Sequence, residues 1–157
     1  MAAPPTLADG TVGEVMSTGV VFCSPETSLR TVARMLSAYG IHCVVVLGPA
    51  GETPVRRIRG VVCDLDLVES AAAGEIDELT AGGLARSPVP TLCPSDPLDG
   101  AARLMAAAGS AHVVVLDPNG GRPIGVLSTV DVARALAGGP LPRRRGPRAV
   151  PAAQAST

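Results

Sequence analysis

Aromatic residues are almost missing from this 157-residue chain, which has one Phe, one Tyr and no Trp. Proteins that hold single-stranded nucleic acid stack its bases on several aromatic rings, so the composition argues against that kind of binding. The net charge is −1, and the tail from Pro140 carries four arginines and no acidic residue, which leaves the rest mildly acidic. An acidic body does not favour nucleic acid as a partner.

Long apolar runs and metal-binding spacings are also missing. No apolar stretch approaches the ~20 residues that span a bilayer. The first ten residues, MAAPPTLADG, lack the basic and apolar regions of a signal peptide. No CxxC motif occurs among the four cysteines, which are Cys23, Cys43, Cys63 and Cys93. We therefore expect a cytoplasmic protein with reduced thiols, no membrane segment and no metal site.

What the chain does have is an internal repeat, built from a 46% share of hydrophobic residues. Residues 24–47 align with 93–116 at an offset of 69, and both stretches end in VVVL. The offset then falls to 65, where GVVCDLD (60–66) aligns with GVLSTVD (125–131). The four extra residues of the first copy lie in a Gly/Pro-rich loop, as expected for a length change at the surface.

Each copy predicts the element order β-α-β-β-α. Apolar spacing and a terminal glycine predict helices over 24–40 and 97–108, and the last helix of each copy over 65–74 and 130–137. Short β-branched runs predict the strands, which are 20–22, 41–47, 55–62, 89–92, 112–116 and 122–127. The fold class is therefore α+β. One such unit leaves an apolar sheet face open, so we expect the two repeats to pack through their sheets as a pseudo-twofold pair.

The repeat also sets the expected domain boundaries. They are an N-terminal extension (1–10), repeat 1 (11–74), a linker (75–79), repeat 2 (80–138) and a disordered Pro/Arg-rich tail (139–157).

The stretch GVLSTVD suggests two roles for the same residues. Gly125 lies late in a strand, where close backbone approach is useful. Ser128 and Asp131 have the spacing of a capping box, which would stabilise the start of the last helix. The amides of a helix start also suit a phosphate, and a nearby carboxylate suits a ribose diol. In the first copy Cys63 replaces the hydroxyl residue, Asp66 is kept, and Asp64 can still cap the helix.

The duplicated unit, with VGEVM (12–16) before it and GVLSTVD leading into its final helix, resembles a pair of CBS domains over residues 11–138. Members of that family bind adenosine-containing ligands through a G-h-h-[ST]-x-x-D motif, in a cleft between the repeats. The resemblance implies ligand contacts from Ser128 and Asp131. It also implies that the same cleft is lined by five further residues: Thr18, Val20, Ile41, His42 and Ala111. A weaker second cleft would contain Cys63, Asp66 and His112.

We weigh three functions. The first is a stand-alone regulatory module that binds AMP, ADP, ATP or S-adenosylmethionine and signals to an unknown effector protein, without a required cofactor. The second, an enzyme, is disfavoured because the sequence shows no nucleophile–base pair and no Gly-rich phosphate loop. The third is a ligand-free scaffold for dimerisation and protein interaction. Apolar terminal helices predict a homodimer in either case. His42 and His112 each lack a second ligand at metal spacing, so we interpret them as polar strand edges.

Overall fold

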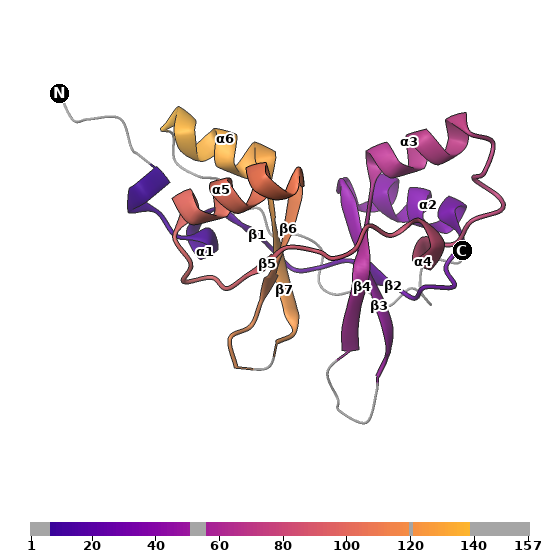
Figure 1. The fold of residues 1–157 in the computed structure, drawn as a ribbon, viewed down its shortest axis with the longest axis horizontal. Coiled ribbons are helices and arrows are strands. Elements are labelled where there is room, and N and C mark those ends of the chain that lie inside the picture. The colour runs from indigo at the N-terminus through magenta and orange to yellow at the C-terminus, as the bar shows by residue number, and fades with distance from the viewer. Residues whose placement is uncertain (1–6, 51–55, 120, 139–157) are drawn as a thin grey trace. The chain divides into compact units, whose positions relative to one another are not determined.

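The computed structural model describes residues 7–50, 56–119 and 121–138. The predicted tail (139–157) and the first six residues of the N-terminal extension lie outside the described residues. The chain forms two compact units (Figure 1). One, the Ser128 unit, joins the residues up to Gly19 to those from Pro90, and the other, the Cys63 unit, spans Val20–Val89. The described part is a mixed α+β fold with two repeats, as the sequence predicts.

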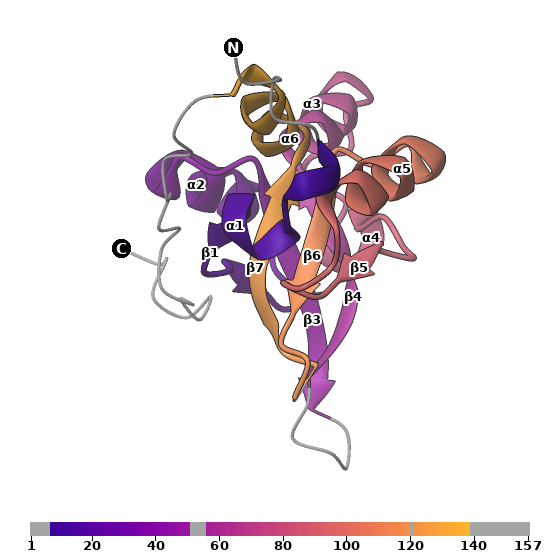
Figure 2. The ribbon, with the colours of Figure 1, turned by 90° about the vertical axis from the view of Figure 1, so that its left-hand side faces the viewer.

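The Ser128 unit has a four-stranded sheet in the order β1-β7-β6-β5, seen most directly in Figure 2. Strand β7 is antiparallel to both β1 and β6, and β5 is parallel to β6. The strands are β1 (Ser17–Thr18), β5 (Thr91–Leu92), β6 (His112–Leu116) and β7 (Pro123–Ser128). The helices are η1 (Leu7–Asp9), α1 (Val12–Val15), α5 (Leu98–Ala108) and α6 (Thr129–Ala137). The fully buried side chains that join helices to sheet include Val12, Leu98, Val113 and Leu127.

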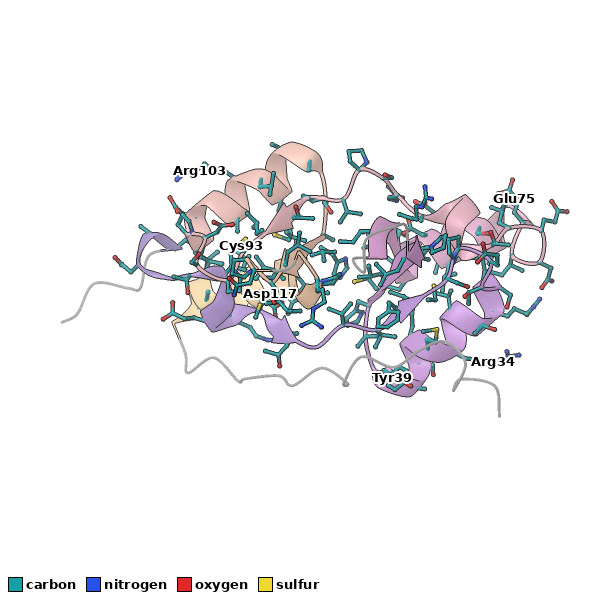
Figure 3. The ribbon with its side chains drawn as sticks, turned by 90° about the horizontal axis from the view of Figure 1, so that it is seen from below. Arg34, Tyr39, Glu75, Cys93, Arg103 and Asp117 are labelled. Carbon is teal, nitrogen blue, oxygen red and sulfur yellow. The ribbon has the colours of Figure 1, made fainter. Side chains whose placement is uncertain are left out.

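The Cys63 unit has a three-stranded sheet in the order β2-β3-β4, with β2 parallel and β4 antiparallel to β3. Its strands are β2 (Phe22–Cys23), β3 (Cys43–Ala50) and β4 (Arg56–Cys63). Its helices are α2 (Leu29–Tyr39), α3 (Asp64–Ala72) and α4 (Ala81–Leu84). Its core includes Leu29, Val32, Met35, Val44 and Val62. The polar sides of α2 and α5 carry Arg34 and Arg103, which project away from their helices (Figure 3).

The element bounds correct some of the predictions. Helix α2 begins at Leu29 rather than at residue 24, because Ser24–Thr27 forms a turn closed by Thr27 N–H donating to the Ser24 carbonyl. The Ser28 hydroxyl then accepts from the Thr31 amide and caps the helix. The predicted glycine stop is confirmed, since Gly40 ends α2 with φ of 60°. Cys63, not Asp64, is the N-cap of α3, so the prediction that Asp64 caps this helix is wrong.

Two short helices that the sequence analysis did not predict, α1 and α4, fix the first residues of each repeat. Gly13 of α1 donates its amide to the Pro94 carbonyl at 2.8 Å, and Gly82 of α4 donates to the Pro25 carbonyl at 2.8 Å. The pair 13 and 94 becomes 82 and 25 by the same offset of 69 residues. Residues 11–19 and 80–88 are therefore equivalent, and each lies against the repeat that contains its proline partner.

Candidate functional site

Ser128 and Asp131 form a closed pair at the start of α6. Ser128 is the last residue of β7 and the N-cap of α6. Its backbone N–H and its hydroxyl both donate to Asp131 Oδ2, at 2.8 and 2.9 Å, and its hydroxyl accepts from the Asp131 amide at 3.3 Å. Asp131 is 6% exposed, and its Oδ1 lies 3.3 Å from Arg134 Nη1. The capping box is thus present, and it holds a buried carboxylate at a helix N-terminus.

The glycine of the motif allows the preceding segment to approach. A Cβ on Gly125 would lie 2.7 Å from the Ser17 carbonyl oxygen, closer than real side chains come to backbone. Strand β1 pairs with β7 at this point, with Ser17 opposite Val126 and Thr18 opposite Gly125. The predicted close backbone approach at Gly125 is confirmed.

Three of the other predicted residues lie in the Ser128 unit. Thr18 is exposed on β1. The carbonyl of exposed Ala111 accepts from the Thr129 amide at 3.0 Å, which places it beside the start of α6. His112 is 8% exposed and stands directly opposite Ser128 across β6 and β7. Within this unit, His112 therefore lies beside Ser128.

The Cys63 unit repeats the arrangement with a different partner. Asp66 is 3% exposed, and its Oδ2 accepts from the Cys63 amide at 2.7 Å. Its Oδ1 accepts from Arg86 Nε at 2.5 Å, and Arg86 Nη2 also donates to Glu69 at 3.1 Å. The hydrogen bond to Asp66 raises the pKa of Arg86 above its ordinary value. Asp66 is thus engaged by a charged partner from outside its own helix.

The remaining predicted residues also belong to the Cys63 unit. His42 Nδ1 lies 2.9 Å from Asp64 Oδ2, and the His42 carbonyl accepts from the Asp64 amide at 3.0 Å. Ile41 packs against the core of this unit, and Val20 is buried with 4% exposure. Within the Cys63 unit, His42 therefore lies beside the start of α3, which carries Cys63 and Asp66.

Arg86 is the residue that the sequence analysis missed. It forms an antiparallel bridge with Val61, just as Ser17 pairs with Val126 in the Ser128 unit. Extending the 69-residue offset upstream would have aligned Ser17 with Arg86. That alignment was the available signal, but it needed the short helices α1 and α4 to be recognised first.

The described residues were compared with the requirements of a metal site and of a membrane-spanning helix. No group of three or more His, Cys, Asp or Glu side chains that could hold a metal occurs among them. Within the same residues, no helix is both long and apolar enough to cross a bilayer.

A family model for the CBS domain matches the chain twice, at residues 12–73 and 81–138. The chain belongs to the CBS domain family. The two matches correspond to the two copies of the repeat, and each one includes its G-h-h-x-x-x-D stretch. A search of curated protein sequences gave no match.

Solved structures show the same fold. The CBS domain pair of protein MJ0100, in complex with 5′-methylthioadenosine and S-adenosyl-L-methionine, superposes with a TM-score of 0.71 at 20% identity, covering 82% of this chain and 96% of that one. CBSX2 in complex with AMP gives 0.62 at 25%, covering 82% and 96%. Hypoxic Response Protein I with two coordinated zinc ions gives 0.63 at 22%, covering 79% and 97%.

Proposed function

We propose that this CBS protein is a regulatory module that binds an adenosine-containing ligand at the start of α6 and passes the signal to a partner protein. The ligand class is AMP, ADP, ATP or S-adenosylmethionine. The observation that carries the proposal is the buried Asp131 carboxylate beside the Ser128 hydroxyl at a helix N-terminus. Solved relatives hold AMP or S-adenosyl-L-methionine, which supports the ligand class.

The geometry of Asp131 is compatible with ligand exchange. Its Oδ1 is 3.3 Å from Arg134, which is beyond the usual N–H···O range, so a ribose hydroxyl can replace that contact at little cost. The guanidinium of Arg134 then stands beside the helix start, where it suits an anionic group of the ligand. In the Cys63 unit a ligand would instead have to displace Arg86, which holds Asp66 Oδ1 at 2.5 Å. We therefore propose that the ligand prefers Asp131 to Asp66.

A thermal-shift panel of adenosine compounds tests whether the protein binds any of them, because a ligand that binds only the folded state raises the melting temperature. The best compound is then titrated by calorimetry into wild type, Asp131→Ala and Asp66→Ala. Hydrogen bonds to charged groups are worth roughly 1.5–3 kcal/mol, so Asp131→Ala should weaken binding about ten- to a hundredfold. Asp66→Ala is the matched control and should bind nearly as wild type does.

Two results would contradict this function. Tight binding by Asp131→Ala together with weak binding by Asp66→Ala would show that the ligand binds at Asp66 in the Cys63 unit, against the proposed preference. No binding by any compound at millimolar concentration would leave the motif as a helix cap. Melting curves of each variant accompany the titrations, since Asp131 also stabilises the start of α6.

We also propose that the protein forms a homodimer through its terminal helices. Leu65 and Val68 on α3, and Val130 and Leu136 on α6, are 50–63% exposed. A groove of about 500 Å³ runs between α5 and α6, lined mainly by Ala102, Met105, Ala106, Val132 and Leu136. A second copy of the chain presents the same apolar helices, which suits the self-complementary interface of a twofold dimer.

Light scattering tests the dimer. Wild type should have the mass of two chains at micromolar concentration, and Leu136→Glu should shift it to one chain, because a charge would be buried in the interface. Arg103→Glu, on the exposed side of α5, is the control and should remain dimeric. A wild-type monomer, with or without nucleotide, would contradict the proposal. We further propose a cytoplasmic location, since none of the four cysteines forms a disulfide in the described structure.

A further inference from the structure

Cys43 and Cys63 face each other across the β3–β4 hairpin. Cys43 opens β3, Cys63 closes β4, and the two are paired in register. The Asp64 amide donates to the His42 carbonyl just beyond them, so Cys43 and Cys63 are a non-hydrogen-bonded pair of the ladder. Facing Cα atoms in such pairs are typically about 4.5 Å apart, within the ~4.4–6.8 Å that a disulfide requires.

The fold does not require sulfur at either position. The Ser128 unit has His112 and Ser128 at the equivalent points of β6 and β7, which form the same register pair. Both units have the glycine beside a paired residue, and in both the aspartate accepts from the amide of the N-cap residue. The two facing thiols are therefore specific to this copy of the repeat.

The two thiols have different environments. Cys63 is half-buried and is the N-cap of α3. Cys43 is buried with 8% exposure. A hydrogen bond with Cys63, followed by burial, raises the pKa of the Cys43 thiol well above its usual range. Cys63 is thus the thiol of the pair that solvent and small oxidants can reach.

We propose that Cys43 and Cys63 form an oxidation site that a small-molecule disulfide converts to an intrachain disulfide. The Cys63 thiolate attacks one sulfur of the oxidant, forms a mixed disulfide and releases the first small thiol. Cys43 then loses its proton to solvent and attacks the Cys63 sulfur, which forms the Cys43–Cys63 bond and releases the second small thiol. Two cysteine thiols are oxidised, and the small disulfide is reduced to two thiols.

The product would act on the start of α3. A bond to Cys43 holds the N-cap residue of α3 at the first residue of β3, next to Asp66 and its partner Arg86. This inference depends on no ligand, so it stands or falls separately from the nucleoside proposal.

The test incubates the full-length protein with oxidised glutathione, alkylates the remaining thiols in denaturant and maps peptides by mass spectrometry. Cleavage after arginine separates the two cysteines, because Arg56, Arg57 and Arg59 lie between them in the sequence. Wild type should lose the mass of two hydrogen atoms and give a crosslinked peptide pair containing Cys43 and Cys63. Cys23 and Cys93 should remain alkylated.

Variants at each cysteine test the order of the steps. Cys63→Ser, which inserts the residue of the other unit, should abolish the crosslink and the glutathione adduct at this site. Cys43→Ser should abolish the crosslink but retain glutathione on Cys63. Cys93→Ser is the control and should crosslink as wild type does. The proposal is overturned if wild type gains only separate glutathione adducts, or if Cys63→Ser still loses two hydrogens.

Discussion

The Ser128 unit and the Cys63 unit place a buried aspartate at the same point, yet an arginine reaches it from a different segment in each. In the Ser128 unit Arg134 comes from the same helix as Asp131, at 3.3 Å. In the Cys63 unit Arg86 comes from residues 80–88, at the start of the second repeat, and holds Asp66 at 2.5 Å. Glu69, at the helix position that matches Arg134, adds a second acceptor for Arg86.

The difference teaches that the motif alone does not decide how available its carboxylate is. Both units have the glycine, the N-cap position and the aspartate, so both have the same helix start. Position 86 carries an arginine that reaches Asp66, whereas the equivalent position 17 carries a serine; both positions lie outside the motif and are held beside it by strand pairing. A duplicated fold can thus keep the N-cap residue in both copies while one of its two aspartates, Asp66, is occupied by an ion pair with an arginine.

The double variant Cys63→Ser/Arg86→Ser is expected to have the largest effect, since it gives the Cys63 unit the residues of the Ser128 unit. Freeing Asp66 from Arg86 should strengthen nucleoside binding at that unit about ten- to a hundredfold, the range for a hydrogen bond to a charged group. Calorimetry should then show two sites per chain instead of one. Arg59→Ser, which removes another arginine of the unit, is the control. An unchanged single site would show that Arg86 does not decide the preference.

Alanine at Gly13 and at Gly82, the glycines that donate to Pro94 and Pro25, should lower the free energy of unfolding by different amounts. A Cβ on Gly82 would lie 2.7 Å from the Pro25 Cβ and 3.0 Å from its carbonyl oxygen, whereas on Gly13 the same distances to Pro94 are 3.0 and 3.1 Å. Overpacking of this kind costs about 1–3 kcal/mol, so Gly82→Ala should lower the free energy of unfolding by that amount and Gly13→Ala by less. Urea unfolding measures both.

Gly83 provides the control for this comparison, because it lies in the same helix and a Cβ there would be 3.8 Å from its nearest neighbours. Gly83→Ala should be neutral or stabilising, since alanine favours a helix by up to ~1 kcal/mol over glycine. Equal losses for Gly82→Ala and Gly83→Ala would mean that helix α4, rather than the contact with Pro25, is sensitive.

Removing the N-cap side chains should give a smaller difference. Ser128→Ala loses a hydroxyl that accepts from the Asp131 amide and should cost about 0.5–2 kcal/mol. Cys63→Ala should cost less, because a thiol is a weak acceptor. Thermal unfolding compares the two, with Ser128→Thr as a variant that keeps the hydroxyl. A greater loss for Cys63→Ala would show that its sulfur contributes more than the serine cap.

The smallest effects should come from two exposed ion pairs, Arg30–Asp77 and Arg103–Asp99, whose partners differ in their separation along the sequence. A hydrogen bond with Arg30 lowers the pKa of Asp77, and one with Arg103 lowers that of Asp99. A lowered folded-state pKa stabilises the fold above the carboxyl's unfolded pKa, and this stability is lost as pH falls through the folded value. The effect is slight because solvent screens these pairs.

Carboxyl titration by NMR measures the pairs directly. Arg30→Gln should raise the pKa of Asp77 and leave that of Asp99 unchanged, and Arg103→Gln should do the reverse. Arg103 projects outward from α5 (Figure 3). It is four residues from Asp99 in the sequence, whereas Arg30 and Asp77 are 47 residues apart. If the pKa of Asp77 is the same in wild type and in Arg30→Gln, the segment after α3 does not hold Asp77 beside α2 in solution.

Much of the fold could be predicted from the sequence because its signals are local. The strand over 112–116 is observed with those bounds, and the helix predicted over 97–108 runs from Leu98 to Ala108. The strand follows from its continuous β-branched run, and the helix follows from apolar periodicity and a terminal glycine. Helix α2 was predicted to begin too early because Ser24-Pro25 resembles a helix start, while Ser28 provides the actual cap. Helices of four residues, such as α1 and α4, are too short for periodicity to detect.

The sequence by itself determined the repeat, the order of elements and the Ser128–Asp131 pair, because a capping box closes within one helical turn and needs only neighbouring residues. Tertiary structure decided that Arg86 reaches Asp66 and that Cys43 stands opposite Cys63. Each of these pairs is 20 residues apart, and in the unfolded chain such residues rarely meet. Strand register and the docking of α4 fix their separation, since backbone hydrogen bonds and core packing hold those segments together.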